Sequence, residues 1–385
     1  MNISWLHFGD LHIAGWDDQN LADFLALIDE ANRHLIPGVD FALLPGDNAD
    51  DGEADEYELV QQAIDRCTLP VHAITGDHDR AAGSLDLFQK HLSPKLHRSF
   101  SLKGYHFVLL NSLAVWNPPE FGLGPEQIEW LRNDLAVATA EGLPGVLFMH
   151  AYPSEHGADA ETLRSLIEEH RVLIVEMGHT HYNELANDGK TIYATTRSTG
   201  QIEEGPPGFS ITTLDDSVVS WKFKPIGEWP LVMITSPSDQ RLIVSTACSS
   251  QVVRGTIEVR ARVWGADIKS VSLRIGDGPA QQMASSVDAT WLTEWDSTRV
   301  PDGLNVLTVR AQLHSRECAE DKILALVRQD GVYPGADRKP SDFENALGAW
   351  AEKHILGTQL GPNKNGRAWP SRRQAAKHIP EGAQR

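Results

Sequence analysis

Short runs of apolar residues, most of them closely followed by aspartate or histidine, are the feature that most restricts the fold of this chain. These runs occupy residues 3–8, 41–44, 71–74, 107–110, 146–149 and 173–175. Apolar runs of this length that end in small or polar residues are typical of buried strands. Apolar residues at helical spacing lie between several of them, at residues 21–35, 56–66, 127–139 and 160–170. This alternation predicts an α/β domain with a largely buried sheet.

The polar residues that follow these runs are of types that bind metal ions. They are Asp10 and His12 in DLH, Asp47 in GDNAD, Asp77 in GDHD, His150 after LFM, and His179 and His181 in GHTH. Each motif alone is compatible with a turn or a core histidine, but their ordered combination favours a site. Strand ends converge at one edge of an α/β sheet. Two divalent ions about 3.5 to 4 Å apart, held by carboxylates and imidazoles, can polarise a phosphate ester.

Acidic charge is concentrated in one part of the chain. Residues 1–232 contain 14 basic and 36 acidic residues, residues 233–330 contain 11 and 12, and residues 331–385 contain 9 and 5. So acidic a first part repels a phosphate backbone, which makes a nucleic-acid polymer an unfavourable partner. A small phosphoester remains compatible with this charge, because metal ions supply local positive charge.

Neither a membrane segment nor a disulfide framework is expected. The chain has no apolar run near the ~20 residues that span a bilayer, and it begins without the pattern of a secretory signal. Cys67, Cys248 and Cys318 are widely spaced and odd in number, which fits neither a set of disulfides nor a zinc knuckle. We therefore expect a cytoplasmic protein that does not contact membranes.

The motifs DLH, GDNAD, GDHD, the His150 segment and GHTH, in this order, resemble those of the calcineurin-like metallophosphoesterases. The resemblance covers about residues 1–230. LGPEQIEWLRNDL and YATTRSTGQIEEGPPGFSITTLD are similar to segments of the bacterial cyclic-nucleotide phosphodiesterase and glycerophosphodiesterase branch. The resemblance implies a four-layer α/β/β/α sandwich. It also implies hydrolysis of a phosphoester, with a small phosphodiester favoured, by a hydroxide that bridges two divalent ions (Fe, Mn or Zn).

Carried over by position, the resemblance assigns Asp10, His12 and His181 to one metal, Asp77, His150 and His179 to the other, and Asp47 to both. His78 would hydrogen-bond the phosphate and assist the leaving group, Asp79 would orient the His78 ring, and Asp50 would support the ligands from behind. Four residues are candidate substrate contacts, with packing or plain surface exposure as the alternative for each: Arg80, Tyr152 and Tyr182, which stand beside these motifs, and Arg197 in ATTRSTG.

Asp77 departs from the family pattern, which usually has asparagine at this position. The added negative charge is expected to retain the metals more tightly and to acidify the bridging water less. A more alkaline activity optimum or a different metal preference would follow.

The remainder of the chain has a different pattern. Residues 233–330 form alternating runs separated by turn clusters, which predicts about seven strands in a β-sandwich that resembles bacterial immunoglobulin-like modules. A packing, dimerising or substrate-shaping role is expected there. Within residues 331–385, an amphipathic helix is predicted from Ser341 and Asp342 to about Ile355, followed by a basic, turn-rich tail that docks on the acidic domain or is disordered. A homodimer would use the sandwich or this C-terminal segment.

Three other functions remain open. A phosphomonoesterase would use the same ligands. The opening DLHIAG resembles that of DNA-repair exonucleases, although the acidic charge argues against them. A non-catalytic metal-binding interaction module would be expected to lack ligands, whereas this set is complete.

Overall fold

Two sheets form the first part of the molecule. The computed structural model describes residues 2–356 apart from 117, 119, 201–204, 246–250, 334, 336–338 and 340–341. The five-stranded sheet has the order β11 (Val218–Pro225), β10 (Gly208–Asp215), β1 (Asn2–Phe8), β2 (Phe41–Leu44), β3 (Val71–Ala73). The six-stranded sheet has the order β4 (Arg98–Leu102), β5 (Tyr105–Leu109), β6 (Gly145–Phe148), β7 (Val172–Met177), β9 (Ile192–Thr195), β8 (Glu184–Asn187).

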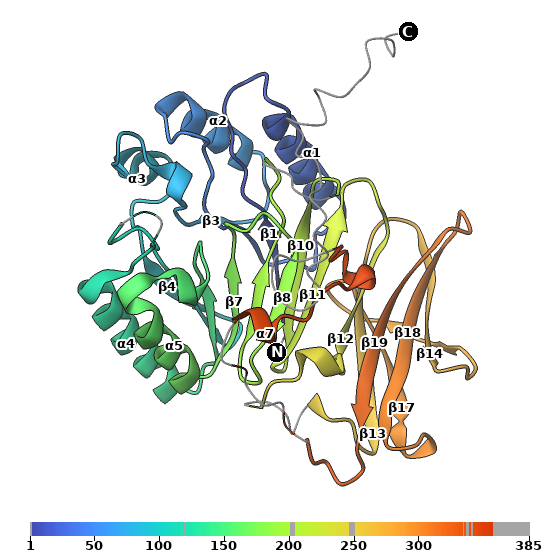
Figure 1. The fold of residues 1–385 in the computed structure, drawn as a ribbon. Helices are drawn as coiled ribbons and strands as arrows, with labels where there is room; N and C mark the ends of the chain where they lie inside the picture. Colours follow the sequence, from blue (N-terminus) through green and yellow to red (C-terminus); the bar gives the residue numbers. More distant parts are fainter. Residues whose placement is uncertain are drawn as a thin grey trace.

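The two sheets face each other, and helices cover their outer faces (Figure 1). One outer layer contains α1 (Gln19–His34), α2 (Ala54–Ile64) and α3 (Asp86–His91), and the other contains α4 (Gly124–Ala140) and α5 (Ala160–Glu169). The predicted strands and helices of this part are therefore confirmed, with ends shifted by a few residues. No helix among the described residues is long and apolar enough to cross a bilayer.

Alternation along β1 explains how one strand serves two cores. Leu6 and Phe8 pack toward α1, whereas Ile3 and Trp5 point between the sheets, as the two-residue period of a strand requires. The Trp5 ring stacks on Phe41 of its own sheet, with ring centroids 5.8 Å apart. It also meets rings from the opposite sheet edge-on, which locks the two sheets together.

A second pair of sheets follows. One has the order β12 (Leu231–Ser236), β13 (Thr256–Trp264), β17 (Thr290–Asp296), β16 (Ala284–Ser285). The other has the order β15 (Gln281–Gln282), β14 (Ile268–Ile275), β18 (Gly303–Leu313), β19 (Cys318–Val327). Residues of both sheets share one apolar core, so the predicted β-sandwich is present. Its immunoglobulin-like character and the domain limits at 232 and 330 stay predictions.

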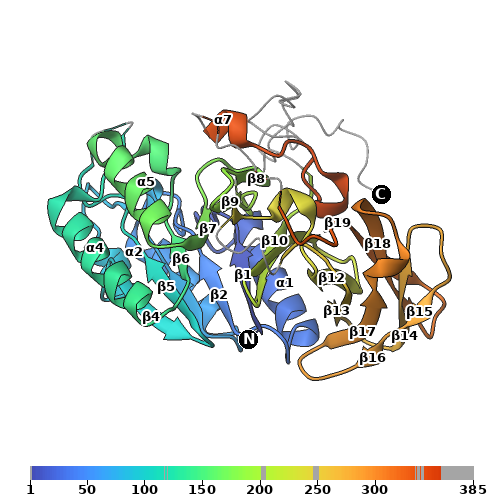
Figure 2. The same ribbon diagram turned by 90° about the horizontal axis from the view of Figure 1, so that it is seen from below.

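The sandwich packs beside α1 and the five-stranded sheet. Figure 2 shows it on the side of the molecule opposite α4 and α5. Leu231, Met233 and Trp264 belong to the same apolar cluster as the inner face of α1. The Arg262 guanidinium also donates to the Gly38 carbonyl in the loop after α1.

The prediction of a helix that runs to about Ile355 is wrong. The structure has only α7 (Asp342–Asn345) and a 3-10 turn at Ala351–Lys353 in this segment. Between them, the Leu347 N–H donates to the Leu185 carbonyl of β8 at 2.8 Å, and Gly348 has a φ of 73°. After α7 the chain therefore runs along the edge strand β8 and bonds to it. Its N–H groups are then not available for the hydrogen bonds of a continuing helix. The basic tail from residue 357 onward and Cys248 lie outside the described residues.

A buried ion cluster joins the three parts of the chain. Asp321 of β19 accepts from Lys222 of β11 at 3.1 Å and from Lys353 of the C-terminal segment at 3.2 Å. The exposed fractions of these three residues are 1%, 6% and 1%. Asp321 also accepts the Ile234 N–H at 2.9 Å, so one carboxylate holds two lysines and a backbone group away from water.

We predict that Asp321→Asn strongly destabilises the protein, because it leaves two buried ammonium groups without a counter-charge. Loss of one partner of a buried pair costs about 3 to 5 kcal/mol of unfolding free energy. Urea denaturation followed by circular dichroism measures this. The matched control is the neighbouring Glu320→Gln, whose pair with Lys322 is about 40% exposed on both sides and is expected to change stability by less than about 1 kcal/mol. Equal effects of the two variants would contradict the prediction.

Candidate metal centre

The candidate ligands come from five loops, each of which follows a strand of the two facing sheets. Asp10 and His12 follow β1, Asp47 follows β2, Asp77 follows β3, His150 follows β6, and His179 and His181 follow β7. The structure brings all of them together in two groups, Asp10, His12, Asp47 and His181, and Asp77, His150 and His179. Within each group the potential ligand atoms lie within 4.8 Å of one another.

The first group is almost completely buried. His12 Nε2 lies 3.3 Å from His181 Nε2 and 3.5 Å from Asp47 Oδ2. His181 Nε2 lies 3.4 Å from Asp10 Oδ2. Two imidazole nitrogens and two carboxylates therefore converge on one point, which is a donor set that suits Zn, Fe or Mn.

The second group is more open to solvent. His150 Nε2 lies 3.1 Å from Asp77 Oδ1, and His179 Nδ1 lies 3.5 Å from the same oxygen. His150 is fully buried, whereas the side chains of Asp77 and His179 are 25% and 32% exposed. A ligand from solvent can therefore reach the centre from this side.

Asp47 connects the two groups. Its Oδ2 faces His12 and its Oδ1 faces His150, both at 3.5 Å. One carboxylate thus presents a different oxygen to each group. This is the arrangement required of a bridging ligand.

Backbone conformation brings the ligands this close. His12, Asp47, His179 and His181 all have φ between 45° and 67°, a left-handed region that is sparsely populated by residues other than glycine. Such strain is stored where the surrounding structure requires a particular side-chain direction. Backbone hydrogen bonds hold the loops in place, since the N–H groups of Leu11 and His12 both donate to the Asp47 carbonyl at 2.9 Å.

The glycines of two motifs have a related purpose. A Cβ at Gly76 would lie 2.2 Å from Asp47 Oδ1, and a Cβ at Gly178 would lie 2.1 Å from Asp10 Oδ1. Any side chain at these positions would displace a candidate ligand. Gly76 and Gly178 therefore each make room for a carboxylate from another loop.

The oxygen and nitrogen lone pairs that point into the centre fit a cation. Asp10 Oδ1 is buried without a hydrogen-bond partner, although a buried carboxylate oxygen needs one. His12 Nδ1 lies 3.2 Å from Asp50 Oδ1, and His150 Nδ1 lies 2.8 Å from the Pro45 carbonyl. With the Nδ1 protons donated to these acceptors, both Nε2 lone pairs are directed into the centre.

The carboxylates of the centre are kept ionised by the neighbouring imidazoles, whose protons a divalent ion would replace. Burial raises the pKa of Asp47, but the charges of His150 and His12 outweigh it and hold the pKa at about 2. Burial also raises the pKa of Asp77, but hydrogen bonds from His150 and His179 outweigh this effect and bring the pKa below its usual range. Both carboxylates are therefore ionised at neutral pH and available as ligands.

Asp79 does not orient the His78 ring, and this expectation was wrong. His78 Nδ1 instead lies 2.6 Å from the Asp50 carbonyl. The Asp79 carboxylate accepts from Gly76 N, from Asn48 N and Nδ2, and from the Tyr57 hydroxyl, at 2.8 to 3.1 Å. Asp79 therefore ties the Asp47 loop to the Asp77 loop. Burial of Asp79 and the negative charge of Asp47 raise the pKa of Asp79 to about 6.

Two of the four candidate substrate contacts are structural residues. Tyr152 is 3% exposed and belongs to the core beneath α4 and α5. Arg197 is 1% exposed, and its guanidinium lies 3.9 Å from the centre of the Phe223 ring. Neither is available to a ligand at the surface, because local packing takes up both side chains. Arg80 lies 5.8 Å above the Trp116 ring, and Tyr182 is 9% exposed; their contacts with substrate stay predictions.

Further residues of the centre were not found from the sequence. The Phe121 ring lies against His150 and His179, with centroids 5.9 and 5.0 Å away. His156 is buried, with its Nε2 3.1 Å from Ser112 Oγ, which accepts the His150 N–H. Glu155 Oε1 lies 3.8 Å from His179 Nε2. Only the fold brings these residues to the ligands, and no motif or spacing marks them.

Residues 3–183 match the family described as calcineurin-like phosphoesterase. This part of the chain is similar to that family. The chain is 25% identical over 244 residues to a probable cyclic nucleotide phosphodiesterase of Fibrobacter succinogenes, covering 59% of this chain and 88% of the relative. It is 24% identical over 180 residues to a probable glycerophosphodiester phosphodiesterase of Arcobacter nitrofigilis, covering 43% and 65%. A solved dimetal phosphatase from Danio rerio aligns with a TM-score of 0.47 at 16% identity, covering 59% and 97%.

We predict that Asp47→Ala markedly lowers the amount of divalent metal that the protein retains, because both groups of candidate ligands lose a shared carboxylate. Elemental analysis of the purified protein measures this. Asp51→Ala is the matched control, since Asp51 is an exposed carboxylate in the same loop. Equal metal content in Asp47→Ala and the parent protein would contradict a bridging role.

Proposed function

We propose that this protein is a dinuclear metal-dependent phosphodiesterase that hydrolyses small diesters. The observation that carries the proposal is the position of Asp47, whose two carboxylate oxygens each face a different ligand group at 3.5 Å. In this proposal Asp10, His12 and His181 hold one ion, and Asp77, His150 and His179 hold the other. Two such ions supply Lewis acidity and neutralise the charge that develops on the phosphoryl oxygens.

His78 is the proposed general acid. Its Nδ1 is held by the Asp50 carbonyl, which leaves Nε2 for an oxygen of the substrate. Its ring packs edge-on against His12, with centroids 4.6 Å apart, so it stands next to the first ligand group. A protonated imidazole at this place can hydrogen-bond the ester oxygen and pass its proton to the leaving alkoxide.

Charge and the named relatives favour a small diester over a polymer. Residues 1–232 have a net charge of −22, and a long phosphate backbone would have to cross this acidic surface. The relatives are named for cyclic nucleotides and glycerophosphodiesters, which are both small diesters. A cyclic nucleotide or a glycerophosphodiester is therefore the proposed substrate class.

The test compares two model substrates on the metal-reconstituted protein. We expect bis-p-nitrophenyl phosphate, a diester, to be hydrolysed at a higher kcat/KM than p-nitrophenyl phosphate, a monoester. Asp47→Ala should lose this activity, and Asp51→Ala should keep it. Faster cleavage of the monoester would indicate a phosphatase. Bound metal without turnover of either substrate would overturn the proposal and favour an interaction module.

His78→Ala separates the leaving-group role from metal binding. It should retain the metal content of the parent protein while its kcat falls by about 10²- to 10⁴-fold for substrates with an alkoxide leaving group. The p-nitrophenolate leaving group needs less protonation, so the loss should be smaller for bis-p-nitrophenyl phosphate. A uniform loss on both classes of substrate would contradict the general-acid role.

We predict that Asp77→Asn, which restores the usual family residue, weakens metal retention and moves the pH optimum to lower values. Removal of one negative charge leaves the metal ions more positive, so water at the centre becomes more acidic. Metal content after dialysis against a chelator and the pH dependence of kcat/KM measure the two effects. Asp86→Asn is the control, because Asp86 is exposed at the start of α3. Identical profiles for Asp77→Asn and the parent would contradict the prediction.

The remaining expectations belong to the same proposal. We propose Fe, Mn or Zn as the resident metals, because carboxylate and imidazole ligands suit each of them. A cytoplasmic location, an immunoglobulin-like sandwich and a homodimer through the sandwich or the C-terminal segment stay predictions.

A further inference from the structure

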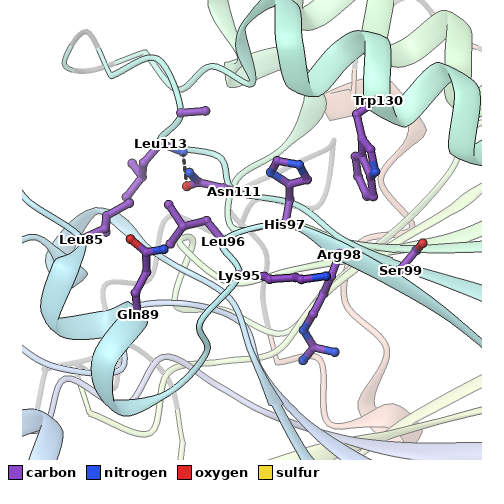
Figure 3. A pocket seen from close by; sticks show the side chains of 11 residues that line it. Leu85, Gln89, Lys95, Leu96, His97, Arg98, Ser99, Asn111, Leu113 and Trp130 are labelled. Carbon is purple, nitrogen blue, oxygen red and sulfur yellow. Dashed lines mark hydrogen bonds between the residues drawn. The ribbon is translucent and has the colours of Figure 1, made fainter.

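A cavity of about 810 Å³ lies beside the metal centre, between α3, β4 and α4. Figure 3 shows the side chains that line it. None of the lining residues is a candidate metal ligand. The volume falls within the range of about 300 to 1,000 Å³ that is usual for small-molecule sites.

The cavity has an apolar wall and a wall with aromatic and basic groups. Leu85, Leu96 and Leu113 form the apolar wall. On the other side, the rings of His97 and Trp130 pack together with centroids 4.6 Å apart. Their planes are tilted by 53°, so the two rings form an aromatic corner. Burial and the charge of Lys95 lower the pKa of His97, which favours its neutral form. A planar ring can stack on one face of this corner and meet the other ring edge-on.

Lys95 supplies the positive charge of the cavity. It is exposed and lines the cavity, and within the described part of the chain it forms no ion pair. The other cation of the wall, Arg98, is bound to His72, with its Nη2 2.9 Å from His72 Nδ1. The nearby carboxylate of Asp134 is already occupied, since it accepts from Ser99 and lies 2.7 Å from His106 Nε2.

Lys95 is an unpaired basic residue in a strongly acidic part of the chain. Residues 1–232 contain 36 acidic and only 14 basic residues, so most basic groups have an acidic neighbour available. A lysine that faces a cavity without such a neighbour attracts an anion. Asn111 adds an amide group to the same space, whereas Gln89 Nε2 and Ser99 Oγ donate to the Pro94 carbonyl and to Asp134.

The cavity wall is also connected to the metal centre. Asn111 Oδ1 accepts from Thr75 Oγ1 at 2.8 Å, and Thr75 is two residues before the ligand Asp77. Leu113 packs against Phe121, whose ring lies on His179. A ligand in the cavity would therefore contact residues that support the second ligand group.

We propose that this cavity is a second binding site, distinct from the metal centre, for a phosphorylated compound with a planar ring, of the class of nucleoside monophosphates. The ring stacks on Trp130 with its edge toward His97, and the phosphate pairs with Lys95. The proposal does not rest on the phosphodiesterase function, because it concerns binding to residues that hold no metal.

The test is calorimetric titration of adenosine 5′-monophosphate into the full chain after removal of metal with a chelator. We expect saturable binding, weakened at least fivefold by Lys95→Gln and by Trp130→Ala. Lys90→Gln is the matched control, because it removes the same charge from an exposed position of α3 outside the cavity lining, and it should bind as the parent does. Adenosine alone and inorganic phosphate alone should each bind more weakly than the monophosphate.

Three outcomes would overturn the proposal. The first is the absence of binding up to millimolar concentration. The second is equal weakening of binding by Lys90→Gln and Lys95→Gln. The third is binding that Asp47→Ala abolishes and Lys95→Gln leaves unchanged. The last would place the ligand at the metal centre. Trp130→Phe keeps an aromatic ring in α4 and should bind more tightly than Trp130→Ala, which distinguishes stacking from a general effect on the helix. Hydrolysis of diesters is measured separately, so failure of one proposal leaves the other intact.

Discussion

Convergence of three carboxylates on a buried point is the constraint on which the rest of the structure depends. Asp10 and Asp47 are almost fully buried, and Asp77 is held against two histidines next to them. Like charges removed from water at this distance destabilise a fold unless cations compensate them. The imidazoles supply part of this compensation, and the donor set is suited to divalent ions for the remainder. The strained backbone at four ligands is a consequence of this convergence.

A layer of carboxylates and backbone groups around the candidate ligands holds them in position. Asp79 shows this most clearly, because its carboxylate accepts hydrogen bonds from the loops of both Asp47 and Asp77. The carbonyl of Pro45 and the carboxylate of Asp50 fix two imidazole rings. Ligand direction is thus set by groups that do not themselves face the centre, and these outer contacts determine how closely the two ligand groups approach.

The β-sandwich and the C-terminal segment are joined to the α/β part of the chain by buried polar contacts. Asp321 brings together Lys222, which belongs to the five-stranded sheet, and Lys353 of the C-terminal segment. Apolar contacts between the sandwich and α1 add to this junction. The metal centre and the adjacent cavity lie among the loops and α3, β4 and α4. The sandwich is therefore placed to stabilise the domain from the side, while the loops around the centre stay accessible.

The sequence by itself determined the strands and helices of the first part, the β-sandwich and the membership of the ligand set. Alternating and helical spacing reports burial directly. The parallel strands before Asp10 and Asp47 belong to one sheet and bring these residues to the same edge, whereas His150 follows a strand of the other sheet. The sequence did not determine where side chains without such a pattern point. Tyr152 lies two residues after His150 and Arg197 lies in the segment ATTRSTG, yet both are buried by packing.

Only the tertiary structure decided the contacts between distant segments. The partner of His78, the role of Asp79 and the extended path after α7 all depend on residues that lie far away along the chain. The lack of an ion pair at Lys95 within the described residues likewise depends on which side chains the fold places around it. Local propensity carries no information about such neighbours, because it reflects only the conformations open to each segment alone. Packing of the sheets, helices and loops chooses among those conformations, and that choice places each side chain in the centre, in the core or in the cavity.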